Sequence, residues 1–380
     1  GMGASPGVGK GKVKIVLDMN ELNKVETGDV LVTRMTTPDF VPGMRKAVAI
    51  VTDEGGLTSH ASIVSREMGI PCVVGTEKAT QILHDNDVIT VDGTNGIVYR
   101  GEANIVNQTT EQTNNNSTQI NNQENTYENN LITGTKIMMN LGEPEKIEQY
   151  KWLHFDGIGL MRIEFIITDK IGKHPLYMIQ TGRQQEYIDK LAEGIGQVAR
   201  VINPRPLIVR FSDFKTNEYK NLEGGSNFEP HEENPLIGWR GVSRYISPDF
   251  VEAFKLEIKA IKKLREQGLK NVHVMLPFVR NTDEVRKCLK ILEEFNLINN
   301  HEFRVYLMAE VPAISIIPEE FAELPIYGAS IGSNDLTMGV LGIDRDSAKL
   351  GKMGYFDERN PAVMKAISNI IRGFKKHGKT

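Results

Sequence analysis

The sequence has only two cysteines, Cys72 and Cys288, among its 380 residues. They lie far apart, so they predict neither a disulfide framework nor a metal site built from paired cysteines, and such scarcity is typical of a reducing compartment. Long apolar runs are missing too, and the N-terminus lacks a signal-peptide pattern. We therefore expect a cytoplasmic protein with no membrane segment.

An excess of charge of either sign is also missing. The 45 lysines and arginines nearly balance the 49 aspartates and glutamates, which leaves a formal net charge of −4. A broad basic surface for nucleic acid or anionic lipid is thereby excluded, and any basic site has to be local.

The chain is long enough for two domains, and its composition shows where they divide. Residues 107–130 read NQTTEQTNNNSTQINNQENTYENN and contain almost no apolar side chains, so they cannot bury enough surface to fold. We predict domains at residues 1–105 and 132–380, joined by a flexible linker at 106–131. In the first domain, short β-rich runs at 13–17, 30–33, 47–52, 88–91 and 97–99 predict a compact α/β fold.

In the second domain, strand-like segments alternate with amphipathic ones such as 249–267 and 283–295. This order predicts parallel strands joined by crossover helices, and a (β/α)-barrel is the leading fold at this length. The strand-like segments are KIMMNLG, GIGLMRIEF, PLIVRFSDF, NVHVMLPFV, RVYLMAEVP and YGASIGSNDL. These are two fewer than the eight strands of a complete barrel, so we predict an incomplete one.

One histidine stands in a distinctive setting, within TDEGGLTSHASIVSREMGIPCVVG at residues 52–75. Thr58 and Ser59 are good N-cap residues, so a helix is predicted to begin near His60 and to end at Gly69. The first turn of a helix has unpaired N–H groups and the positive end of the helix dipole, a setting that stabilises a negative group. His60 is therefore a candidate carrier of a phosphoryl group, the alternative being that it merely caps or packs at the helix start.

Charged and amide side chains gather where the barrel strands are predicted to end, the face on which such barrels place catalytic groups. These residues are Arg162, Arg210, Glu310, Asn334 and Asp335. Two carboxylates with an amide neighbour suit Mg²⁺, which prefers oxygen ligands, and arginines bind phosphate and carboxylate in a planar fork. Arg240, on the loop ENPLIGWRGVSRY, could close over this face. The set predicts a site for a small phosphorylated carboxylic acid.

The segment GGLTSHASIVSREMGIPCVVG resembles the phosphohistidine segment of the phosphoenolpyruvate-utilising enzymes. Further stretches are most similar to the phosphoenolpyruvate synthase (pyruvate, water dikinase) branch of that family, namely VRFSDFKTNEY, ENPLIGWRGVSRY, MLPFVR, SIGSNDLTMGVLGIDRDS and FDERNPAV. The resemblance implies a swivelling phosphohistidine β/β/α domain followed by an incomplete phosphoenolpyruvate/pyruvate-type (β/α)8 TIM barrel.

The resemblance also implies roles for single residues. His60 would be phosphorylated, and its domain would swivel to carry the phosphoryl group. Glu310 and Asp335 would bind Mg²⁺, and Asn334 would contact the phosphoryl group. The phosphate and carboxylate of phosphoenolpyruvate or pyruvate would be clamped by Arg162, Arg210, Arg240 and Arg345.

Two parts of the family pattern are not found in this sequence: the ATP-binding domain and the end of the barrel with its proton-donating cysteine, which Cys288 does not match. We therefore expect a fragment or one part of a split enzyme, with a separate ATP-binding domain or subunit as a partner. The full ATP-dependent reaction is not expected from this chain alone, and protonation of the enolate should be slow. We also expect a homo-oligomer.

Two other functions stay open. One is a phosphoenolpyruvate-dependent protein phosphotransferase like enzyme I, which is disfavoured because there is no room for its helical insertion between Val13 and GDVLVTRMTTPDF. The other is a catalytically impaired assembly or binding subunit, whose open barrel edge a partner would cover.

Overall fold

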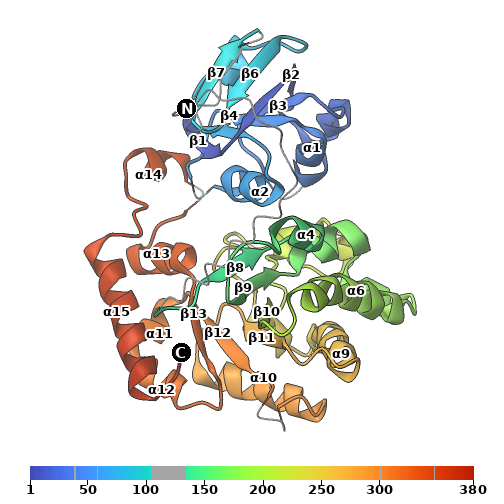
Figure 1. The fold of residues 1–380 in the computed structure, drawn as a ribbon, viewed down its shortest axis with the longest axis vertical. Coiled ribbons are helices and arrows are strands. Elements are labelled where there is room, and N and C mark those ends of the chain that lie inside the picture. Colours follow the sequence, from blue (N-terminus) through green and yellow to red (C-terminus); the bar gives the residue numbers. More distant parts are fainter. Residues whose placement is uncertain (38–39, 58, 102, 104–133, 299–301, 346) are drawn as a thin grey trace, which may run out of the picture.

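The structure is a computed structural model that describes residues 1–37, 40–57, 59–101, 103, 134–298, 302–345 and 347–380. They form two α/β units, drawn one above the other in Figure 1. The linker predicted at 106–131 and the predicted cap Thr58 lie outside the described residues. In the part of the chain that is described, no helix combines the length and the apolar character that crossing a membrane needs.

The first unit is built on a mixed sheet with strand order β1-β5-β4-β3-β2-β6-β7. Its strands are β1 (Met2–Ser5), β2 (Val8–Ile15), β3 (Val30–Thr33), β4 (Ala49–Thr52), β5 (Cys72–Val74), β6 (Val88–Asp92) and β7 (Ile97–Arg100), and its helices are η1 (Met19–Lys24), α1 (Val41–Lys46), α2 (His60–Met68) and α3 (Ala79–Ile82). The sequence prediction missed β1, whose residues pair antiparallel with β5. Two buried apolar clusters stabilise this sheet, and one of them includes Ala61, Val64 and Met68 of α2.

The second unit contains a parallel sheet with strand order β13-β12-β11-β10-β9-β8, which confirms the predicted incomplete barrel. Its strands are β8 (Met138–Leu141), β9 (Gly157–Arg162), β10 (Leu207–Arg210), β11 (Val272–Leu276), β12 (Val305–Ala309) and β13 (Gly328–Ile331). Around it lie η3 (Pro144–Lys146), α4 (Ile147–Tyr150), η4 (Ile166–Ile171), α5 (Pro175–Gln180), α6 (Gln184–Ile202), α7 (Thr216–Lys220), η5 (Gly225–Asn227), α8 (Val242–Tyr245), α9 (Val251–Glu266), α10 (Thr282–Glu294), α11 (Pro312–Ile316), α12 (Pro318–Ala322), α13 (Ser333–Leu341), α14 (Ala348–Lys352) and α15 (Pro361–Lys376).

The two faces of the barrel sheet pack into different clusters. One face joins a large core with the surrounding helices, including α6 and α9. The other face forms a small cluster of Leu160, Ile208, Met275, Tyr306 and Met308. Because side chains alternate along a strand, the residue two positions after a member of this small cluster lies on the same face. That rule places the predicted site residues Arg162, Arg210 and Glu310 on the same face as this small cluster, at the ends of their strands.

Glu257, on α9, supports a prediction about stability and pH. Its carboxylate is buried and accepts hydrogen bonds from the backbone N–H (3.0 Å) and Oγ (2.5 Å) of Ser212. Burial raises the pKa of Glu257 to about 7, against an ordinary value of 4.5. The folded protein therefore holds this proton more tightly than the unfolded chain does. The resulting stability is complete below pH 4.5 and is lost as the pH rises through 7.

We expect Glu257→Gln, which cannot ionise, to remove this pH dependence. Between pH 5 and 8, the free energy of unfolding should fall more in the native sequence than in the variant, by on the order of 3 kcal/mol. Denaturant titrations at both pH values measure the difference, and parallel curves for the two proteins would contradict the prediction.

Candidate functional site

His60 is the first residue of α2, as the sequence predicted, and Gly69 ends the helix in the left-handed conformation (φ 64°). Ser59 occupies the N-cap position, but its side chain makes no capping hydrogen bond and lies 3.1 Å from Ser62 Oγ instead. The imidazole Nδ1 of His60 lies 2.9 Å from Thr36 Oγ. If Nδ1–H donates to that oxygen, Nε2 keeps its lone pair. Burial lowers the pKa of His60 to about 4, so the ring is neutral at pH 7.

The predicted barrel residues lie where the parallel strands end. Arg162 and Arg210 are the last residues of β9 and β10, and Glu310 directly follows β12. Asp335 and its neighbour Asn334 lie in the first turn of α13, just after β13. Since the carboxyl ends of parallel strands share one edge of the sheet, these residues come together despite their separation in the chain.

Three buried carboxylates form the centre of this group: Asp213, Glu310 and Asp335. Each offers an oxygen atom, and these atoms all lie within 4.8 Å of one another. Burial and the two neighbouring aspartates raise the pKa of Glu310 to about 8, which shows that negative charge is crowded here. Three oxygen donors in such a place fit Mg²⁺, because a divalent cation would offset the repulsion. Asp213 was not among the predicted metal ligands.

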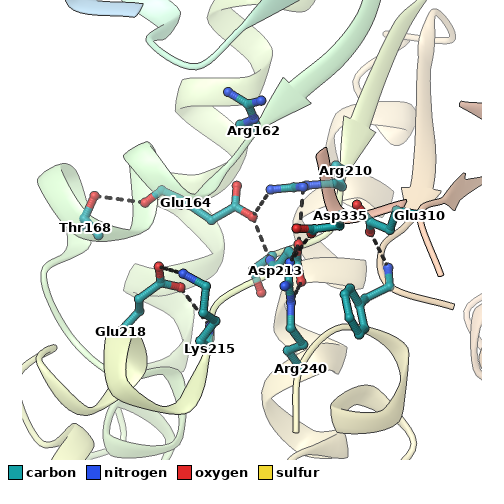
Figure 2. A network of polar contacts seen from close by, with 12 residues as sticks. Arg162, Glu164, Thr168, Arg210, Asp213, Lys215, Glu218, Arg240, Glu310 and Asp335 are labelled. Carbon is teal, nitrogen blue, oxygen red and sulfur yellow. Dashed lines mark hydrogen bonds and ion pairs between the residues drawn. The ribbon is translucent and has the colours of Figure 1, made fainter. Parts of the chain in front are cut away.

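Arginines surround the carboxylates, as Figure 2 shows. Arg240 is buried and donates from Nε (3.0 Å) and Nη2 (2.6 Å) to Asp213, and from Nη2 to Asp335 (3.0 Å). Arg345 donates to Asp335 (2.6 Å). Arg210 donates to Glu164 (2.8 Å), and its Nη1 lies 3.3 Å from Asp213. The guanidinium groups of Arg210, Arg240 and Arg345 are thus already paired with carboxylates, and an anionic ligand would compete with these carboxylates for most of its arginine contacts.

Two buried atoms of this cluster have no hydrogen-bond partner among the described residues: Nε of Arg210 and Oε2 of Glu164. A buried unpaired donor or acceptor costs free energy, on the order of 1–3 kcal/mol, so such groups usually have an additional partner. Both residues line the cavity described next, where a bound molecule could supply that partner.

A cavity of about 920 Å³ lies between the two units and joins His60 to the barrel site. His60 lines it from the first unit, and the predicted site residues that line it from the second are Arg162, Arg210, Arg240, Asn334, Asp335 and Arg345. Glu310 is not among the residues that line the cavity, but it is buried and a carboxylate oxygen of Glu310 lies within 4.8 Å of those of Asp213 and Asp335. The structure thus brings the predicted residues into one place.

Direct contacts also join the two units. Glu67 of α2 forms an ion pair with Arg162, and Arg45 of α1 forms one with Asp169. Arg45 also lies 3.9 Å from a carboxylate oxygen of Glu143. The sequence analysis did not identify these pairs, because charged residues on short helices are usually solvated and nothing local indicates a partner about a hundred residues away.

Comparisons with protein families match both units. Residues 25–96 match the family described as PEP-utilising enzyme, mobile domain, and residues 115–380 match the family described as PEP-utilising enzyme, PEP-binding domain.

Similar whole proteins are phosphoenolpyruvate synthases. A probable phosphoenolpyruvate synthase of Staphylothermus marinus is 55% identical over 383 residues, which cover 100% of this chain and 46% of the relative. The phosphoenolpyruvate synthase of Pyrococcus furiosus is 44% identical over 378 residues, covering 100% and 45%. That of Neisseria meningitidis is 41% identical over 396 residues, covering 98% and 48%. The chain therefore spans about half the length of the curated relatives it matches.

Proposed function

The chain belongs to the PEP-utilising enzymes, and on that premise we propose that it transfers a phosphoryl group between phosphoenolpyruvate and His60. The observation that carries the proposal is the shared cavity, in which a neutral histidine of one unit faces arginines and buried carboxylates of the other. We further propose that residues 1–105 move as the carrier domain relative to residues 132–380, in keeping with the match of residues 25–96 to a mobile domain.

In the proposed reaction the lone pair of His60 Nε2 attacks the phosphorus, the bridging P–O bond breaks, and its electron pair remains on the enolate of pyruvate. The enolate then takes up a proton from water at carbon to give pyruvate. In this proposal the Nδ1–H of His60 donates to the hydroxyl of Thr36, 2.9 Å away, which leaves the lone pair on Nε2 as the nucleophile. Arg162, Arg210, Arg240 and Arg345 bind the phosphate and carboxylate, and Asn334 contacts the phosphoryl group.

The carboxylates of Asp213, Glu310 and Asp335 would hold the Mg²⁺ ion expected for this chemistry. When bound, the ion supplies positive charge where the enolate oxygen becomes negative. Asp213 and Asp335 also orient Arg240, so the same carboxylates keep a guanidinium beside the reacting groups.

Incubation with phosphoenolpyruvate labelled in its phosphate, with Mg²⁺ present, tests the proposal. We expect an acid-labile phosphate on the protein that is lost in His60→Ala and in Glu310→Ala. Circular dichroism spectra of both variants control for folding. A native protein that takes up no label, or a His60→Ala variant that still takes it up, would overturn the proposed function.

Thr36→Val removes the hydroxyl that fixes the tautomer of His60 while keeping its shape. We expect the labelling rate to fall by about 10-fold to 100-fold, because the ring then spends time as the wrong tautomer or in the wrong orientation. Thr36→Ser keeps the hydroxyl and should retain most of the rate. A Thr36→Ser variant as slow as Thr36→Val would show that the methyl group matters rather than the hydrogen bond.

A further inference from the structure

The ion pair between Glu67 and Arg162 joins the moving unit to a residue of the proposed substrate site. Glu67 follows His60 by seven residues on α2, so the two lie on the same face of the helix, about two turns apart. Both side chains line the cavity. Any motion that brings His60 to the barrel therefore also brings a carboxylate to Arg162.

Arg162 lies in cationic surroundings that suit an anion. Burial, and then the nearby Arg210 and Arg345, lower the pKa of Arg162 to about 10, although Glu164 and Glu310 act in the opposite direction. Glu67 places one carboxylate oxygen on this guanidinium, while its second oxygen is buried and has no hydrogen-bond partner among the described residues. The carboxylate of Glu67 thus occupies the guanidinium where an anionic group of the substrate is expected, without being fully satisfied itself.

We propose that Glu67 is a positioning residue that competes with the substrate for Arg162. The inference rests on the proposed function and adds an order of events to it. With the site free of substrate, Glu67 neutralises Arg162. When phosphoenolpyruvate or pyruvate binds, its carboxylate or phosphate takes the guanidinium, and Glu67 is displaced.

A second contact allows this exchange to occur without separating the units. Arg45 of α1 pairs with Asp169 and lies near Glu143, and neither of these carboxylates touches Arg162 in the described contacts. The docked arrangement therefore has one ion pair that the substrate can replace and one that it leaves in place. Displacement of Glu67 thus loosens the docked arrangement, while the pair of Arg45 with Asp169 keeps the carrier unit in place.

The test is the affinity for oxalate, a dianion that resembles the enolate of pyruvate and has no phosphoryl group to transfer. Isothermal titration with Mg²⁺ present should give a dissociation constant that is about 5-fold to 10-fold lower in Glu67→Gln than in the native protein, because the competitor has lost its charge. A gain in affinity is a result that damage to the fold would not produce. In an Arg162→Met background, Glu67→Gln should give no further gain.

A matched control separates competition from a general loss of negative charge. Glu54→Gln removes the same charge from the same unit, but the partner of Glu54 is Arg34 of that unit, at 3.2 Å. It should leave the dissociation constant unchanged. In labelling kinetics with phosphoenolpyruvate, Glu67→Gln should lower the half-saturating concentration, since the substrate no longer competes with a charged side chain for Arg162.

An unchanged or higher dissociation constant in Glu67→Gln, an equal gain in Glu54→Gln, or a gain that persists with Arg162→Met overturns the competition and leaves the proposed phosphoryl transfer standing. Failure of every variant to bind oxalate, together with failure of the native protein to take up label, overturns both.

Discussion

Replacing Asp213 by Asn should weaken Mg²⁺ binding by about 10-fold to 100-fold or more. Losses of that size already follow when a residue that only supports a metal ligand is removed. The variant keeps the shape of the side chain but removes one of the three carboxylates that would hold the ion. It also removes the fork that holds Arg240 through two of its nitrogens. We therefore expect the labelling rate at saturating Mg²⁺ to fall by about 100-fold to 1,000-fold. Titration calorimetry gives the affinity without relying on activity.

Glu164→Gln is the matched control for that experiment. Glu164 accepts hydrogen bonds from Arg210 (2.8 Å) and from the backbone N–H of Asp213 (2.7 Å), so it contacts the same surroundings. It is not one of the three carboxylates that converge. Its replacement should leave the Mg²⁺ dissociation constant within about threefold of the native value, since it removes no ligand. Equal losses in both variants would show that total charge, rather than the Asp213 carboxylate, governs binding.

The sequence predicts best where the local rules are strong. The start of α2 at His60 and its end at Gly69 are predicted from the residue types before the helix and from the glycine after it, and the structure confirms both bounds, although Ser59 makes no capping hydrogen bond through its side chain. The barrel strands are apolar runs between amphipathic helices, so their order and parallel pairing could also be inferred. Knowing where each strand ends was then enough to select Arg162, Arg210 and Glu310.

Features that depend on distant partners could not be predicted in this way. β1 is short and contains a glycine, and it is a strand because β5 pairs with it. Asp213 lies in an irregular segment after β10, and only the fold brings it to Glu310, which is remote in the chain. Glu67 reads as an ordinary surface charge on a helix until the second unit places Arg162 against it. In each case the missing information is the partner, not the residue.

Glu229→Gln should destabilise the barrel unit by about 3–5 kcal/mol, the usual cost of breaking a buried ion pair on one side. Glu229 accepts hydrogen bonds from both terminal nitrogens of Arg244 (2.6 and 2.8 Å), and its Oε1 lies 2.9 Å from His174 Nε2. These three side chains are almost completely buried. Without the carboxylate, the guanidinium of Arg244 keeps its charge but loses its counter-charge. Denaturant unfolding followed by far-ultraviolet circular dichroism measures the loss.

A neighbouring but exposed ion pair provides the control for Glu229→Gln. Lys173 pairs with Glu223, whose side chain is 54% exposed, so Glu223→Gln should cost less than about 1 kcal/mol.

Arg244 also donates to the backbone oxygen of Trp239 (3.0 Å), the residue before Arg240. Loss of Glu229 should therefore also slow labelling, even without denaturant and at a temperature where the variant is folded. Similar destabilisation by Glu229→Gln and Glu223→Gln would mean that burial does not determine the loss of stability. A folded Glu229→Gln variant with a native labelling rate would show that Arg240 is held in place without the contacts between Glu229 and Arg244.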